Sequence, residues 1–403
     1  MIGLPIKRKE DFRLLTGRGK YAADVRLPGL LHAAVLRSPH PHARIAAIRA
    51  GAARALPGVA AVITADDLGA VGRIPVRLGQ RAGAGPNACL QPPLATGLVR
   101  YVGEPVAFVV AASRYLAEDA LELIEIDWEL LPVVADARRA TDPGVPVLHP
   151  AAGGNVIERL KARAGNAESG LAAAERRLSE RLADLLGHPE HLIHFIELEV
   201  GGGFGVRGEF YPEDLVVPWT AMRLGRPVQW IEDRREHLMA ANHSRQQYHE
   251  VEIGVRRDGT IVALRDRFTV DLGGYIRTHG VVVPELTMAL LPGPYRIPNY
   301  AFEQALAAAD YKAVRAEQAR ARGEGRYLGI GFGCVLEKAG LGPWEYARVE
   351  VDGSGRVVVY SGVAAVGQGI ETTLAQVVAG ELSMSADDVT VVHGDSARVP
   401  FGI

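Results

Sequence analysis

Two glycine-rich loops contain the residue types in this sequence that could do chemistry. The first, at residues 200–205, reads VGGGFG and has four glycines in five consecutive positions. Glycine lacks a Cβ atom, so the backbone can approach a ligand closely and can adopt positive φ angles. Backbone N–H groups ahead of a helix favour an anion such as a phosphate. A tight strand-to-helix turn is the simpler interpretation, but so many glycines weaken local structure and therefore favour a ligand.

The same loop also matches a dinucleotide-binding pattern. Gly203, Gly205 and Gly208 form G-x-G-x-x-G, and an acidic pair at 232–233 follows at about the distance that such a site requires. The third glycine should open the next helix, yet residues up to Pro212 separate it from the expected helix start. The elements that follow are hairpins rather than further βαβ units. A nicotinamide or flavin site is therefore kept as an alternative interpretation.

The second loop, at residues 366–369, reads VGQG. Its glycines admit a ligand, and the side-chain amide of Gln368 can donate a hydrogen bond to an oxo group or a phosphate. Taken alone, this loop is interpreted as an ordinary turn. Two glycine loops that each precede a predicted helix together indicate two walls around one large anionic cofactor.

Short strands and helices alternate along residues 1–155 and predict an α/β domain. The helix expected at 114–123 follows Ser113, a residue type that caps helix N-termini. Because the pattern is uninterrupted, this block is also expected to fold by itself. The expected strands are 31–36, 59–64, 106–112 and 123–128.

The rest of the chain has the mixed order of an α+β protein. Leu171, Leu178, Leu182 and Leu185 recur on one face of a helix predicted over 156–187, which needs no chemistry. The other expected elements are a strand at 192–200 and a helix at 213–224 on either side of the first loop, strands at 228–232 and 389–392, helices at 304–322 and 371–382, and hairpins turning at 258–259 and 352–355.

Composition restricts the class of protein. Apolar residues make up 48% and charged residues 23% of the 403-residue chain, as in an ordinary globular protein. The formal net charge of −2 gives no basic excess that would indicate nucleic acid. A secretory signal and a membrane-spanning apolar run are both missing from the sequence, so a cytoplasmic protein is expected. The two cysteines, Cys89 and Cys334, are too few for an iron–sulfur cluster, which must then lie on another chain.

Short motifs follow one another along most of the chain. They lie at 10–11, 15–17, 37–45 and 101–106 in the N-terminal block, and at 201–209, 230–238, 293–299, 342–345 and 367–369 further on. With this ordered set, the sequence resembles the molybdenum-cofactor-binding large subunit of the xanthine dehydrogenase, aldehyde oxidase and carbon monoxide dehydrogenase family.

The resemblance implies an α/β and α+β fold with the domains of that family. An a/b hammerhead domain is expected at 1–155, a helical connector at 156–190, part of a first molybdopterin-binding domain at 191–303, and the start of a second at 304–403.

The resemblance also implies a molybdenum hydroxylase. In such enzymes molybdopterin, often as its cytosine dinucleotide, holds a molybdenum centre that oxidises an aldehyde, an N-heterocycle or CO with a water-derived oxygen. Electrons would leave through a small 2Fe-2S subunit and a medium FAD subunit. Because the pterin holds the molybdenum, no residue is expected as a direct metal ligand. The implied contacts beside the molybdenum and the pterin are Gly202, Gly203, Phe204 and Gly205, and further cofactor contacts are Gly367, Gln368 and Gly369.

The chain also departs from the family. Family segments have no counterpart after Arg177 and after Glu303, and the large C-terminal part with the catalytic glutamate is not matched. Hydroxylation needs a base, so the catalytic residue is unknown. Glu209, Glu213 and Glu371 are expected to be helix-start or surface groups. A truncated, catalytically inactive paralogue that keeps only the shell of the fold is therefore the second hypothesis.

Overall fold

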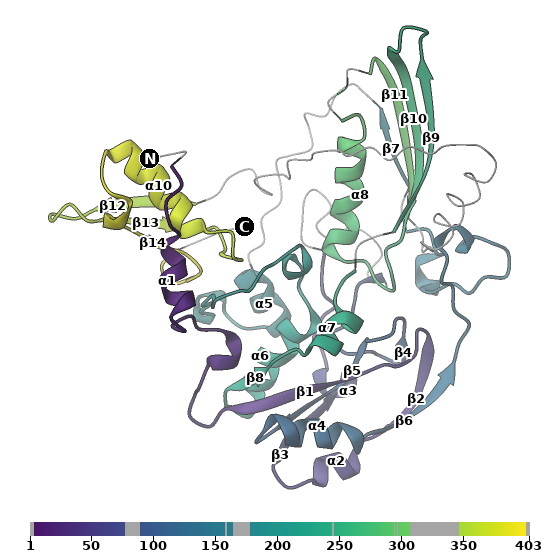
Figure 1. Ribbon diagram of the computed structural model, residues 1–403. Helices are drawn as coiled ribbons and strands as arrows, with labels where there is room; N and C mark the ends of the chain where they lie inside the picture. The colour runs from purple at the N-terminus through teal and green to yellow at the C-terminus, as the bar shows by residue number, and fades with distance from the viewer. Residues whose placement is uncertain are drawn as a thin grey trace.

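The strands form four separate sheets within the part of the chain that the structure describes, two with four strands and two with three. Figure 1, a ribbon view of this computed structural model, shows the sheets containing β1 to β6 at one end of the molecule, the sheet containing β9 to β11 at the other, and the C-terminal elements to one side. None of the described helices is long and apolar enough to cross a membrane. The described residues are 4–76, 89–157, 159–163, 178–243, 246–293, 295, 297–306 and 346–399.

The first sheet combines strands of the N-terminal block with one strand from further along the chain. Its strands are β1 (Leu31–Arg37), β3 (Val59–Thr64), β5 (Pro105–Ala111) and β8 (Val228–Trp230). The order is β3-β5-β1-β8, with β5 antiparallel to both its neighbours and β8 parallel to β1. All seven residues of β5 are buried, as expected for a strand in a sheet covered on both faces.

Helices cover both faces of this sheet. They are α2 (Gly51–Ala55), α3 (Ala65–Leu68), α4 (Arg114–Glu122) and α6 (Pro212–Leu224). On one face, Ala120 of α4 shares a buried cluster with Val109 of β5. On the other, Val216 of α6 shares a cluster with Phe108. Successive residues of β5 therefore face a helix of the N-terminal block and a helix from later in the chain.

A small antiparallel sheet completes the N-terminal region. Its order is β4-β2-β6, from β4 (Leu98–Val99), β2 (Ala43–Arg49) and β6 (Glu125–Leu130). Ala43 and Val99 are fully buried in its core, against which Trp128 packs.

The third sheet has the order β7-β11-β10-β9 and includes the predicted hairpin. Its strands are β7 (Arg159–Arg163), β9 (Gln247–Val255), β10 (Ile261–Val270) and β11 (Asn299–Leu306). Gly259 closes the hairpin between β9 and β10 with a φ angle of +89°, which glycine adopts without strain. Phe268 and Val270 of β10 form a core beside Met288 of α8 (Thr278–Leu290).

The C-terminal elements form a small sheet with one covering helix. They are β12 (Ala347–Val351), β13 (Val357–Ser361), α10 (Ile370–Leu382) and β14 (Val389–Val392). The first helix of the chain, α1 (Lys9–Leu15), lies beside α10 (Figure 1). Lys9 Nζ donates to the carbonyl oxygens of Ala386 and Val389 at 2.7 and 2.8 Å. The start of the chain thus packs on elements near residue 390 rather than on the strands that follow it.

Most predicted elements are confirmed to within a few residues. Ser113 caps α4, since its Oγ accepts a hydrogen bond from the N–H of Leu116 at 3.2 Å. The strands of the N-terminal block, the helices beside the two loops and both hairpins are present. Two further helices, α5 (Leu178–Leu186) and α7 (Arg234–Ala240), complete the described chain, and Leu182 of α5 is buried as its spacing predicts.

The strand predicted over 192–200 is wrong. Among the described residues this segment makes a single bridge, between Ile196 and Asp395, and its other backbone hydrogen bonds go to scattered acceptors such as the carbonyl of Lys20. With no neighbouring strand to form a ladder, its apolar side chains stay partly in solvent, and Ile196 is 64% exposed.

The helix predicted over 156–187 is wrong in its first part. Residues 159–163 form β7, because β11 offers them a free edge for antiparallel pairing. Only α5 remains of the expected helix, and residues 164–177, with Leu171, lie outside the described residues. Residues 304–306 of the helix expected at 304–322 belong to β11, and the remainder is also outside the described part.

Candidate cofactor site at the two glycine loops

The first glycine loop has a backbone that only glycine adopts easily. Gly202 and Gly205 have φ angles of +124° and +81°, and Phe204 lies in the left-handed region at +49°. The Phe204 ring folds back over Gly202, where a Cβ atom would collide with it. The ring is nevertheless 96% exposed. The loop therefore presents a strained backbone and an uncovered aromatic ring.

The second loop is closed by the side chain of Gln368. Its Oε1 accepts from the N–H of Val366 at 2.7 Å, and its Nε2 donates to the carbonyl of Ala364 at 2.8 Å. Gly367 and Gly369 on either side have φ angles of +100° and +76°. One of the two amide hydrogens of Gln368 is thus used to hold the loop.

The structure brings the two loops together. A Cβ atom built on Gly203 would lie 3.4 Å from Cβ of Val366, and one on Gly367 would lie 3.7 Å from the carbonyl oxygen of Val200. No acceptor within the described part of the chain is hydrogen-bonded to the N–H groups of residues 201–205 or 367–369. Two rows of unpaired donors side by side can bind an anionic or oxygen-rich group.

Neither loop uses a helix N-terminus in the expected way. At α10, Glu10 already occupies that position: its Oε1 accepts from the N–H groups of Glu371 and Thr372 at 2.9 and 3.3 Å. The first loop runs into a short 3₁₀ turn, Val206–Gly208, rather than into α6. An anion at this site would therefore be held by the loops themselves.

The dinucleotide interpretation of Gly203, Gly205 and Gly208 lacks its required geometry. No strand precedes the loop, since 192–200 is irregular, and the third glycine does not open a helix. A Cβ on Gly208 would instead collide with the ring of His279. The glycine pattern here has a packing cause and not the strand–loop–helix arrangement of a dinucleotide site.

Charged side chains lie beneath the second loop. Arg13 of α1 binds Glu371 through two hydrogen bonds of 2.8 and 2.6 Å and reaches Glu199 at 2.5 Å. His393 lies between Glu197 and Glu371, at 3.2 and 3.3 Å. These hydrogen bonds raise the pKa of His393 to about 9. This network joins four separate stretches of the chain.

This network holds the carboxylate of Glu371 firmly ionised. Burial alone would raise the pKa of Glu371, but the hydrogen bonds from His393 and Arg13 outweigh it and lower that pKa to about 2.

Glu209 is buried and lies ahead of α6, neither at a helix start nor on the surface, which corrects the sequence expectation. Glu213 and Glu371 lie in the first turns of α6 and α10, as expected, although Glu213 is also buried. Glu213, at the start of α6, pairs with the buried guanidinium of Arg37 at 2.9 Å. Glu209 accepts from the N–H of His279 at 2.8 Å and lies 3.9 Å from Arg277. Burial acts to raise the pKa of Glu209, but these partners lower it below its ordinary value. Each of the three carboxylates considered from the sequence is therefore ion-paired.

The sequence alone does not identify the charged neighbours of the second loop, which are Glu10, Arg13, Glu197, Glu199 and His393. They come from three distant stretches, and no local pattern relates them. The one signal in the sequence is that Glu10 belongs to the motif at residues 10–11.

Three family models together match most of the chain. The model for the aldehyde oxidase and xanthine dehydrogenase a/b hammerhead domain matches residues 16–132. Models for the molybdopterin cofactor-binding domain match residues 172–328 and 304–403. The chain therefore belongs to the molybdopterin-dependent oxidoreductases of the xanthine dehydrogenase type.

Relatives of known name agree with this family. The chain is 30% identical to the 6-hydroxypseudooxynicotine dehydrogenase complex subunit gamma of Paenarthrobacter nicotinovorans, over 100% of the chain and 66% of the relative. It is 27% identical to the carbon monoxide dehydrogenase large chain of Afipia carboxidovorans, over 100% and 67%. The crystal structure of quinoline 2-oxidoreductase from Pseudomonas putida matches with a TM-score of 0.84 and 31% identity, over 100% of this chain and 67% of that one.

The chain spans about two thirds of the length of the curated relatives that it matches. The alignment with the first of these runs over 525 residues, although this chain has 403. Segments of that relative therefore have no counterpart here, in agreement with the internal departures from the family noted in the sequence.

Proposed function

We propose that the two glycine loops hold the pterin of a molybdenum cofactor and that the chain is the cofactor-binding large subunit of a molybdenum hydroxylase. The contact between the loops carries this proposal, because it gathers N–H groups that have no acceptor in the described part of the chain. When bound, molybdopterin supplies two-electron oxidation with an oxygen derived from water. The protein's part is to bind and orient it.

The residues present fit such a group. Gly205 leaves room for close approach, because a Cβ there would meet nothing within 4 Å. The N–H groups of Gly202, Gly203 and Gly205 can donate to the oxygens of the cofactor. The exposed ring of Phe204 would pack against the bound cofactor and lose its contact with water. Gln368 keeps one amide hydrogen for the cofactor while it holds the loop, between Gly367 and Gly369.

The substrate class and the partners are part of this proposal. We infer an aldehyde, an N-heterocycle or CO as substrate, and the cytosine dinucleotide form of the cofactor. The names of two relatives, a subunit of a dehydrogenase complex and a large chain, support partner chains. These would be a small 2Fe-2S subunit and a medium FAD subunit in the cytoplasm, with no iron–sulfur cluster on this chain.

A catalytically inactive paralogue is the second candidate. The state of the three carboxylates favours it, since Glu209, Glu213 and Glu371 each face an arginine and none is free to take a proton. A carboxylate held in an ion pair is a poor general base at neutral pH.

The two candidates differ in metal content. The chain would be purified from a host that makes molybdopterin, and its molybdenum and pterin would be measured. Near-stoichiometric metal and pterin support the cofactor site. A folded sample with neither contradicts it and leaves the inactive paralogue.

Gly203→Val tests the site at the point where the loops touch. The added side chain would be forced against Val366, only 3.4 Å from the position of its Cβ, so pterin content should fall at least about tenfold. Gly353→Val is the matched control, because a Cβ there meets nothing within 4 Å. Equal pterin loss in both variants would show that the loops are not the site.

A further inference from the structure

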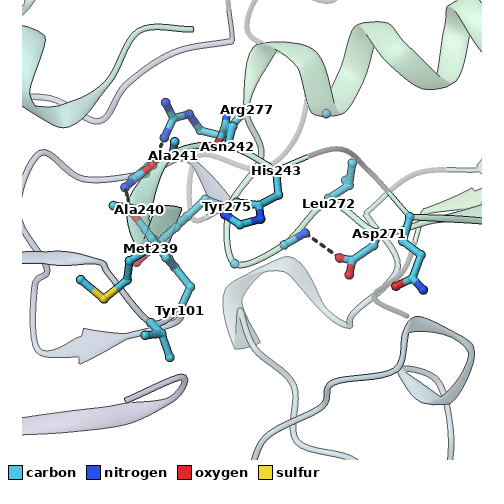
Figure 2. A pocket seen from close by; sticks show the side chains of 16 residues that line it. Tyr101, Met239, Ala240, Ala241, Asn242, His243, Asp271, Leu272, Tyr275 and Arg277 are labelled. Atoms are coloured by element: carbon cyan, nitrogen blue, oxygen red, sulfur yellow. Dashed lines mark hydrogen bonds between the residues drawn. The ribbon is translucent and has the colours of Figure 1, made fainter. Parts of the chain in front are cut away.

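A cavity of about 340 Å³ lies where the N-terminal block meets the later part of the chain. Tyr101 lines it from the N-terminal block, the segment 239–243 lines it from the end of α7 onward, and Tyr275 and Arg277 line it before α8 (Figure 2). This volume lies near the lower end of the range for small-molecule sites, so one or two fused rings would fill it.

The nitrogens of two side-chain amides in its wall have no hydrogen-bond partner among the described residues. The Nδ2 atom of Asn242 and the Nε2 atom of Gln246 are both withdrawn from solvent, and neither donates to an acceptor within the described residues. Buried donors left unpaired are costly, because they have given up hydrogen bonds to water. A ligand with an acceptor atom could therefore supply the hydrogen-bond partner that these two donors lack.

The charged side chains around the cavity already have partners within the protein. Arg277 donates to the side chain of Gln91 and, at 2.9 Å, to the carbonyl of Phe210, and Glu209 lies 3.9 Å away. Asp271 accepts from the N–H of Gly273 at 2.7 Å, as Figure 2 shows. A charged ligand would find no free counter-charge among these groups, so a neutral one fits better.

His243 also lines the cavity, and its Nε2 lies 3.1 Å from the carbonyl oxygen of Leu238. The remaining wall is apolar or aromatic. The rings of Tyr101 and Tyr275 meet edge to face, with their centroids 6.2 Å apart, and Met239 and Leu272 add apolar surface. Flat rings pack well against such walls.

We propose that this cavity binds a neutral ring compound carrying a carbonyl group, such as a lactam, whose oxygen accepts hydrogen bonds from Asn242 and Gln246. The site goes beyond the cofactor function proposed above, because its binding needs no cofactor. It adjoins the first glycine loop through Tyr211, whose hydroxyl accepts from the N–H of Asn242 at 3.2 Å and donates to the carbonyl of Val206 at 3.1 Å.

Two probes of equal shape test the proposal on the full chain. Isoindolin-1-one carries the lactam carbonyl, and indane has the same two-ring skeleton without it. Ligand-detected NMR and calorimetry should show isoindolin-1-one binding at least about tenfold more tightly than indane, with or without molybdopterin. Equal binding, or no binding of either probe, would overturn the proposal, and so would tighter binding of benzoate, which would indicate an anion site at Arg277.

Variants that remove the donors but keep the volume test the assignment. Asn242→Leu and Gln246→Met should each reduce binding of isoindolin-1-one about tenfold and leave binding of indane unchanged. They should also fold well, because each removes an unpaired buried donor. Met222→Leu, at an exposed position of α6 outside the cavity, is the control and should bind both probes as the unaltered chain does. Unchanged lactam binding in both donor variants would show that the amides play no part.

Discussion

Glu10 shows how a single residue can connect the two ends of the chain. Its carboxylate is 7% exposed and accepts hydrogen bonds from two backbone N–H groups at the start of α10 and from the hydroxyl of Thr372. Carboxylates at this position satisfy unpaired helix donors and interact favourably with the helix dipole. The same residue therefore holds α1 and fixes the helix that follows the second glycine loop.

Replacing Glu10 should destabilise the protein. Glu10→Ala leaves the helix donors and Thr372 unpaired, so the free energy of unfolding should fall by about 1–3 kcal/mol. Urea denaturation measures this change. Glu122→Ala, at an exposed position of α4, should change stability by less than about 0.5 kcal/mol. A Glu10 variant as stable as this control would show that the cap contributes nothing.

His393 gives the protein a dependence on pH. Glu197 and Glu371 raise the pKa of His393 to about 9 in the folded protein. Because the ordinary pKa of histidine is near 6.5, the contribution of His393 to the stability of the folded state is fully present below pH 6.5 and is lost as pH rises through about 9. The free energy of unfolding should therefore decline between pH 7 and pH 9.5. His393→Gln should flatten this decline. A variant that keeps the full decline would place its origin elsewhere.

At the scale of elements, local capping predicts helix starts better than hydropathy predicts strands. Ser113 caps α4 as its residue type suggests. The apolar run at 192–200 has residues typical of a strand, but it pairs with no strand among the described residues. Residues 159–163 lie in a segment predicted to be helical, but they pair with the edge of β11. A strand exists only where another strand pairs with it, which local sequence does not record.

The cap of α4 provides a quantitative test at this scale. Ser113→Ala removes the acceptor for the N–H of Leu116 and should lower the free energy of unfolding by about 0.5–2 kcal/mol. Ser113→Asp retains an acceptor and should remain close to the unaltered chain. Thermal or urea unfolding of both variants gives the comparison, and equal loss in both would rule out capping as the cause.

For the whole molecule, the first sheet contains strands from both the N-terminal block and the later chain, which argues against independent folding of residues 1–155. The alternating pattern of this block predicts independent folding, yet β8 pairs with β1 and α6 covers the face that includes Phe108. Without these later elements, that face of the sheet would lie in water.

Limited proteolysis tests this dependence. Cleavage between residues 164 and 177 should leave two pieces that stay associated, because β8 and α6 belong to the second piece. A fragment of residues 1–155 produced alone should aggregate or be digested. A soluble fragment with cooperative unfolding would show that the block is independent after all.

The sequence by itself determined the family, most helices and hairpins, and the two loops where glycine is required. These depend on local patterns: capping residues, periodicity, positive φ angles and ordered motifs. The positions proposed for cofactor contact, Gly202 to Gly205 and Gly367 to Gly369, were all identified at this level and stay a prediction.

Only the tertiary structure decided how distant segments meet. It placed Gly203 against Val366, brought Glu10 to α10, paired β8 with β1 and enclosed the cavity beside Asn242. Each of these contacts joins residues far apart in the chain. Their energies come from burial, pairing and charge in the folded state, so no local pattern specifies them.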